Sequence, residues 1–168
     1  MALSQDLLRQ ARHLATKEKR RPQQASLRRA ISTAYYALFH LLSSEAASLV
    51  SPAQPAGIGR HIQRALTHGD MKNAAKGISQ PNLGRPYSAL ISTTVLPELA
   101  DVARHFVTLQ EERHAADYDI NRTFDRLHAL AQVSLAEAAF KKWASVRGKP
   151  QANVFLMMLF FGKALSAR

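Results

Sequence analysis

The sequence of 168 residues contains no cysteine, so disulfide bonds and thiolate metal sites are excluded. Glycine and proline number seven each, which is too few for a loop-rich or disordered chain. The longest apolar run, Val154 to Phe161, is too short to span a bilayer, and the N-terminus has no apolar segment of the signal-peptide kind. These absences predict a one-domain cytoplasmic protein with a hydrophobic core and no membrane association.

Acidic residues are scarce, because 12 Asp and Glu stand against 23 Lys and Arg, for a formal net charge of +11. Such a surplus favours an anionic partner: RNA, DNA, an acidic protein or a membrane surface. It is concentrated within residues 17–29, where Glu18 alone opposes the basic residues. The residues of this segment that we expect to bind nucleic acid are Lys19, Arg20, Arg21, Arg28 and Arg29. A second basic group is Lys141, Lys142, Arg147 and Lys149. The alternative interpretation is a solvated basic surface.

Apolar residues recur with a helical period throughout, and no segment alternates like a strand. One stripe lies in residues 7–15, with Ser4 as its expected N-cap, and a second helix is expected over about 25–50. A shorter helix near 60–67 should end at His68-Gly69, and the glycines and prolines of 70–93 predict an irregular, mobile segment.

Pro97 fits the first turn of the next helix, with Thr94 as a possible cap. Another helix should start at Asn121 or Thr123, carry a stripe that includes Leu127, and stop at Gly148. A last helix, 153–165, is apolar on nearly all faces and should be buried on the bundle or at a dimer interface. The predicted fold is all-α, an antiparallel up-and-down helical bundle over 1–150 with an appended C-terminal helix over 151–168. We expect a homodimer.

Two segments carry polar groups that a core does not need: RRAISTAYYALFHLL (28–42) and EERHAADYD (111–119). Together they resemble the HEPN superfamily, in particular its small stand-alone prokaryotic members, through the motifs YYA-x-FH at Tyr35 to His40 and R-x-x-ADY at Arg113 to Tyr118. Helical order and spacing fit over roughly residues 5–147. The resemblance implies an RNA- or nucleotide-associated protein of toxin–antitoxin or defence type, with a nucleotidyltransferase as a plausible partner. Many family members are metal-independent ribonucleases, in which an Arg and a His four to six residues later act at a dimer interface.

This chain departs from that ribonuclease motif, since Asp117, Tyr118 and Asp119 occupy the positions where the His is expected. Arginine can stabilise charge on a phosphate, and histidine can move protons near neutral pH. The candidate catalytic residues are therefore Arg113, His114, Tyr118 and His40, with His61 as a further possible proton carrier.

A structural alternative exists for each motif. Arg113 and Asp117 are four residues apart and can form an ion pair, and Tyr36 and His40 can touch while filling the core. The alternative function is then a non-catalytic helical interaction module that binds a protein partner. His61 and His68 lie two helical turns apart, but no further ligands have metal-site spacing, so we predict no metal and no cofactor.

Overall fold

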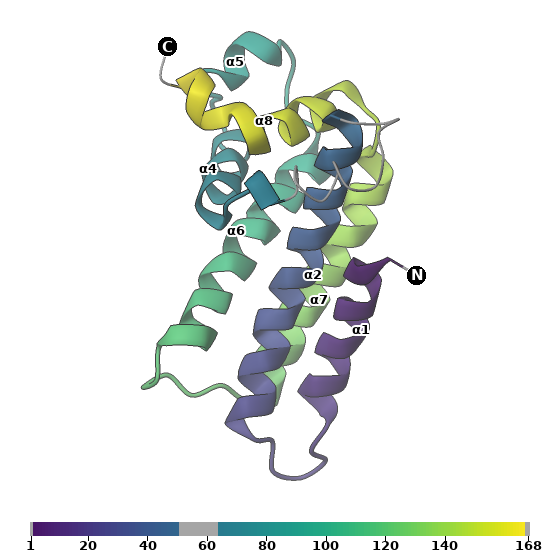
Figure 1. Cartoon of the computed structure of the whole chain (residues 1–168), viewed down its shortest axis with the longest axis vertical. Helices are drawn as coiled ribbons and strands as arrows, with labels where there is room; N and C mark the ends of the chain where they lie inside the picture. Colours follow the sequence, from purple (N-terminus) through teal and green to yellow (C-terminus); the bar gives the residue numbers. More distant parts are fainter. Residues whose placement is uncertain (1, 51–63, 167–168) are drawn as a thin grey trace. The chain divides into compact units, whose positions relative to one another are not determined.

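The computed structural model describes residues 2–50 and 64–166, and every regular element within them is helical, which confirms the all-α class (Figure 1). The elements are α1 (Leu3–Thr16), α2 (Gln24–Val50), α4 (His68–Ile78), α5 (Tyr87–Leu90), α6 (Pro97–Tyr118), α7 (Arg126–Val146) and α8 (Pro150–Ser166). None of the described helices combines the length and the hydropathy that crossing a bilayer requires.

The chain forms two compact units. Unit 1 comprises Met1–His40 and His105–Lys141, and unit 2 comprises Leu41–Arg104 and Lys142–Arg168. The helices α2, α6 and α7 therefore contribute residues to both units. The domain boundary predicted at residue 150 stays a prediction.

Unit 1 is a bundle of α1 and parts of α2, α6 and α7, in which α1 and α2 run antiparallel across the loop of residues 17–23 (Figure 1). The helix predicted over about 25–50 is confirmed as α2, and its apolar residues Leu27, Ile31, Tyr35 and Leu38, which recur with a helical period, are all fully buried. Phe106 and Leu109 of α6 and Val133 and Ala136 of α7 complete this core. The paired polar motifs are thus mounted on helices that are fixed by apolar packing.

The start of α7 was predicted too early. It begins at Arg126, where the Asp125 carboxylate accepts the His128 backbone N–H at 2.7 Å and caps the first turn. The buried face then runs through Ala129 and Val133. Leu127 lies two residues before Ala129, on the opposite side of the helix, and is 78% exposed, so its assignment to the core was wrong.

Unit 2 contains α4 and α8, which pack against each other (Figure 1). The prediction of an irregular segment over 70–93 is wrong for its first part, which is helical. Helix α4 starts at His68, where a helix was expected to end. Thr67 caps the start of α4, because its hydroxyl oxygen accepts the Asp70 backbone N–H at 3.1 Å, and this hydrogen bond stabilises the first turn. Half of the helix predicted near 60–67 lies outside the described residues; in the other half, residues 64–65 are helical and residues 66–67 are not.

Two other predicted caps are wrong. Helix α1 begins at Leu3, so Ser4 lies inside the helix and is buried. Pro97 is the first residue of α6, as predicted, but Thr94 lies three residues before it, and Leu96 occupies the capping position. Gln151 acts there instead, because its side-chain carbonyl accepts the Leu96 N–H at 2.8 Å and its amide donates to the Thr94 carbonyl.

The end of α7 is confirmed at Gly148, whose positive φ of 78° stops the helix. Helix α8 follows from Pro150, three residues earlier than expected. Phe155, Met158 and Leu159 are buried, whereas one face stays open: Met157 is 48%, Phe161 45% and Leu165 41% exposed. Burial of α8 is therefore confirmed for one face only.

Candidate functional site

The two polar motifs meet in unit 1, across α2 and α6. The Arg113 Nη2 donates to the Tyr36 hydroxyl at 2.7 Å, and the Arg113 Nε lies 2.9 Å from the Asp117 Oδ2. The Ser32 hydroxyl donates to the other carboxylate oxygen of Asp117 at 2.7 Å. We call these four residues the Arg113 cluster. Ser32 and Tyr36 are one turn apart on α2, as are Arg113 and Asp117 on α6, so two facing turns close the network.

Aromatic rings surround the guanidinium. The Arg113 Cζ lies 5.9 Å from the Tyr35 ring centroid, 5.4 Å from that of Tyr36 and 5.7 Å from that of Tyr118. At these distances the negative ring faces attract a cation. The Arg113 side chain is 12% exposed and that of Asp117 24%.

Burial alone would lower the pKa of Arg113, but the Tyr36 hydrogen bond and the Asp117 charge outweigh it, and the net pKa is raised. The charge is therefore permanent and is already neutralised by Asp117. A phosphate that bound Arg113 would have to displace this carboxylate from a largely buried position, against the repulsion of Asp117 itself.

The other three candidate catalytic residues surround the Arg113 cluster without completing an Arg–His pair. Tyr118 is 63% exposed and touches Arg113 on one side, while the exposed His114 ring lies 4.9 Å from the Tyr118 ring. His40 contacts Tyr36, with 6.5 Å between ring centroids, and burial lowers its pKa. The structure thus links all four through tyrosines, and it records ring contacts, not a relay of hydrogen bonds, for the two histidines.

The basic segment divides into one structural arginine and several exposed cations. Arg28 donates to the carbonyl oxygens of Ala116 and Asp119, both at 2.8 Å, and to that of Arg122. The Ala116 carbonyl belongs to the last turn of α6, where helix carbonyls lack partners, and the other two follow the helix, so Arg28 caps that end. Arg28, one of the five residues predicted to bind nucleic acid, therefore has a structural role.

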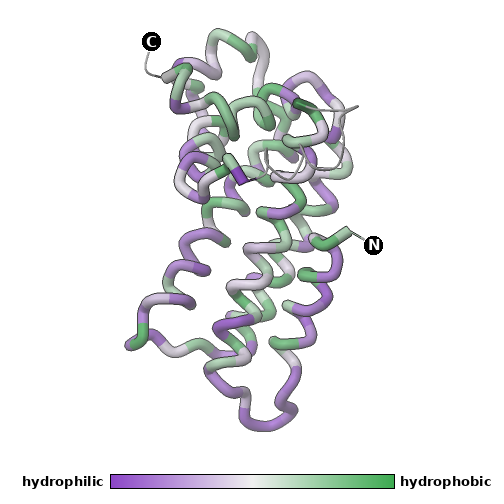
Figure 2. Tube along the Cα trace, viewed as in Figure 1, coloured by the Kyte–Doolittle hydropathy of each residue, from purple (hydrophilic) through white to green (hydrophobic). Residues whose placement is uncertain are grey.

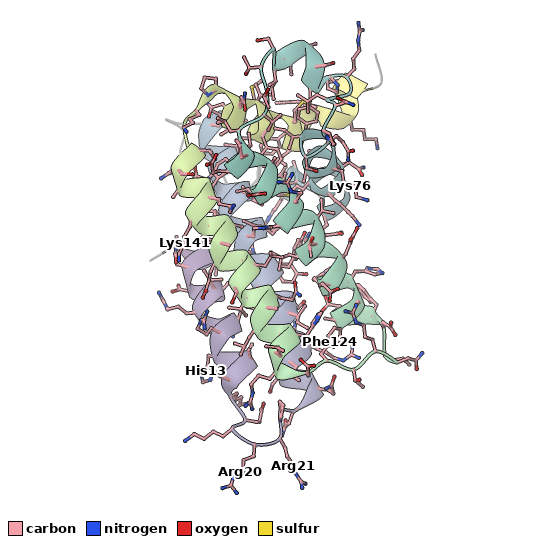
Figure 3. The ribbon with its side chains drawn as sticks, turned by 180° about the vertical axis from the view of Figure 1, so that it is seen from behind. His13, Arg20, Arg21, Lys76, Phe124 and Lys141 are labelled. Carbon is pink, nitrogen blue, oxygen red and sulfur yellow. The ribbon has the colours of Figure 1, made fainter. Side chains whose placement is uncertain are left out.

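The remaining four, Lys19, Arg20, Arg21 and Arg29, are exposed and form no ion pair with any described residue. Figure 3 shows Arg20 and Arg21 at the tip of the loop of residues 17–23, directed away from the ribbon. Arg126, which sequence analysis missed, donates to the backbone carbonyls of Glu18 and Lys19 and ties this loop to α7. The whole loop is hydrophilic (Figure 2).

The second basic group is partly neutralised. Lys142 forms an ion pair with Asp101, and the Arg147 Nε lies 2.7 Å from a Glu45 carboxylate oxygen. Lys142 and Arg104 hold the pKa of Asp101 below its ordinary value. Only Lys141 and Lys149 of this group lack a carboxylate partner among the described residues.

One further polar group lies between α6 and α7, where Glu112 accepts from Arg122 at 2.9 Å and contacts the His128 Nε2 at 2.7 Å. Sequence spacing gave no signal for it. Across residues 2–50 and 64–166, no three His, Asp or Glu side chains gather as metal ligands would. His61 lies outside the described residues.

A comparison with protein-family models, with curated proteins and with solved structures found no match to this chain.

Proposed function

We propose that this chain is a non-catalytic, RNA-associated helical module of HEPN-like type, which binds the RNA backbone through a basic loop. The basic loop consists of Lys17, Lys19, Arg20 and Arg21, with Arg29 beside it on α2. The proposal rests on a difference between Arg113 and the loop cations in how accessible they are to a phosphate. The Arg113 guanidinium is buried against Asp117, whereas the loop cations are exposed and unpaired with described carboxylates.

The same contrast argues against phosphodiester cleavage at Arg113. A catalytic arginine must reach the phosphate as charge develops, and a nearby group must carry the proton. Arg113 instead makes its contacts within the Arg113 cluster, and the His expected after it is replaced by Asp117, Tyr118 and Asp119. Anion binding at the basic loop needs neither group, because it depends on exposed charge alone.

The test is RNA affinity as a function of salt. We expect the wild-type protein to bind a single-stranded RNA of about 20 nucleotides with a Kd that rises steeply with salt concentration, since each phosphate contact adds about 0.7 to the log–log slope. The charge reversals Arg20→Glu and Arg21→Glu together should weaken binding at least about tenfold and reduce the slope by about 1–2.

The matched control is Lys141→Glu with Lys149→Glu, which changes the net charge equally at exposed positions outside the basic loop. Equal losses in the two double variants would mean that net charge, not the basic loop, governs binding. A parallel incubation of labelled RNA with the wild-type protein should leave the RNA intact. Cleavage that Arg113→Met abolishes without lowering stability would overturn the non-catalytic assignment.

We also propose that the chain forms a homodimer through α8. Met157, Phe161 and Leu165 are exposed at intervals of four residues, so they form one apolar face, and a second copy of the same face would match it. Met157→Glu with Phe161→Glu should yield a monomer by sedimentation at micromolar concentration, with the helical content unchanged. A wild-type protein that is monomeric under these conditions would refute the dimer. The nucleotidyltransferase partner stays a prediction from the resemblance.

A further inference from the structure

Unit 2 contains a cleft of about 650 Å³ between α4, the segment that leads into α5, and α8. Its size is typical of pockets that hold small organic molecules. The lining includes buried apolar side chains, of which Ala74, Tyr87 and Met158 are each at most 5% exposed. The Tyr87 hydroxyl donates to the Ala74 carbonyl at 2.7 Å, so the ring is fixed in place.

Glycine is concentrated here, because Gly77, Gly84 and Gly162 are three of the seven in the chain. Glycine inside a helix is unfavourable, so Gly77 in α4 and Gly162 in α8 call for a reason. A Cβ atom at Gly77 would overlap the Tyr87 ring, so that glycine lets the ring seat against α4. A Cβ at Gly162 would meet only the Met158 Cε, at 3.4 Å, which is ordinary contact. A methyl group at Gly162 would thus overlap no described atom, but it would take up space at the cleft, whose lining includes Gly162.

The charges of the lining indicate the ligand class. Arg85 and Lys163 are exposed and form no ion pair with a described residue. The one carboxylate of the lining, Asp70, already accepts the Thr67 hydroxyl at 2.7 Å. A second cleft in unit 2 has one cation, Arg104, which is paired with Asp101. The first cleft thus combines an apolar base with two available cations.

We propose that this cleft binds a small organic anion, with an apolar, ring-sized body over Tyr87 and Met158 and one carboxylate or phosphate held by Arg85 and Lys163. The inference is independent of the basic loop, which belongs to unit 1. An apolar body matches the buried apolar side chains of the lining, and a single anionic group matches two cations whose attraction is reduced by Asp70.

The test uses the fluorescent probe 8-anilinonaphthalene-1-sulfonate, a flat aromatic anion, on the full chain. We expect saturable binding with one site per chain. Arg85→Ala and Lys163→Ala should each weaken it about tenfold, and Gly162→Leu should abolish it by filling the cleft. Gly162→Ala, a milder filling at the same position, should weaken it less. Melting curves report whether each variant folds.

Two controls make the assignment specific. Lys141→Ala removes an exposed cation outside the cleft and should change nothing. Phe161→Gln removes an apolar side chain that neighbours Gly162 but does not line the cleft. Loss of the signal in Phe161→Gln, with retention in Arg85→Ala and Lys163→Ala, would place the probe on the exposed face of α8 and overturn the proposal.

Competition distinguishes the anionic groups. Benzoate and phenyl phosphate should displace the probe, whereas neutral benzamide should not. The compound that displaces the probe at the lower concentration identifies whether the cleft prefers a carboxylate or a phosphate. Equal displacement by benzamide would refute the role of Arg85 and Lys163.

Discussion

Replacement of Arg113 by methionine tests whether the Arg113 cluster is structural. The variant keeps an apolar stem of similar length and removes the ion pair with Asp117, the hydrogen bond to Tyr36 and the attraction to three tyrosine rings. Asp117 keeps the Ser32 hydroxyl as a donor and remains in partial contact with water. In the variant, the negative charge of Asp117 is therefore only partly compensated.

The expected loss lies between two limits. Removal of one partner from a fully buried ion pair costs about 3–5 kcal/mol, and exposed pairs contribute about 0–1 kcal/mol. Exposures of 12% for Arg113 and 24% for Asp117 place the pair near the buried limit, and the Ser32 bond lowers the cost. We expect the free energy of unfolding to fall by about 2–3 kcal/mol, which lowers the Tm of a chain this size by about 5–10 °C.

The matched control is Arg12→Met in the same unit. Arg12 donates to Glu137 through three hydrogen bonds of 2.9, 2.7 and 2.7 Å, a richer geometry than that of Arg113, but the side chains are 51% and 32% exposed. If burial decides the energy, this variant should lose less than about 1 kcal/mol. Urea denaturation of both variants measures the difference. A loss in Arg113→Met no greater than that in Arg12→Met would refute the structural role.

Two further predictions follow from unit 2 and from His40. Gly77→Ala should lower the free energy of unfolding by about 1–3 kcal/mol, because the new methyl group overlaps the fixed Tyr87 ring. Gly162→Ala should raise the free energy of unfolding by about 0.5–1 kcal/mol, because alanine favours a helix more than glycine does. Equal effects of the two substitutions in urea denaturation would contradict this prediction. Burial lowers the pKa of His40, so the unfolded chain takes up the proton first as the pH falls below about 6.5. His40 should thus contribute a loss of stability as the pH falls below about 6.5, and His40→Gln should remove it; identical Tm–pH curves for wild type and His40→Gln would exclude this contribution.

The parts of the fold that were predictable are those with an uninterrupted apolar period. The α2 stripe from Leu27 to Leu38 has this property and is buried. The start of α6 was predictable for another reason, because Pro97 is suited to the first turn of a helix, and it is confirmed. Helix α4 was missed because its glycines were taken as breakers, although Thr67 and Asp70 carried a capping signal. Leu127 was misplaced because the buried face runs through Ala129, Val133 and Ala136, and Leu127 lies two residues before Ala129, on the opposite side of the helix.

The candidate site was predictable only where its contacts are local. The Arg113–Asp117 pair follows from a spacing of four residues, and the structure contains it. Arg28 carried no such signal, since its acceptors are backbone carbonyls about 90 residues away, near the end of another helix. Backbone carbonyls have no sequence identity, so an arginine that caps a distant helix looks the same as one that binds phosphate.

The net charge of +11 accordingly overstates what an anion can meet. Arginines of one sequence serve different ends here: Arg12 and Arg147 pair with carboxylates at the surface, Arg28 and Arg126 hold backbone carbonyls, and Arg113 neutralises Asp117. The exposed cations that remain include Lys141 and Lys149, the basic loop of unit 1 and the two cations of the cleft in unit 2. The loop projects its charges without an apolar base, as a backbone of many phosphates requires. The cleft pairs two cations with buried apolar side chains, as a single small anion requires. The difference in surroundings, rather than the charge itself, separates the two binding proposals and makes each testable without the other.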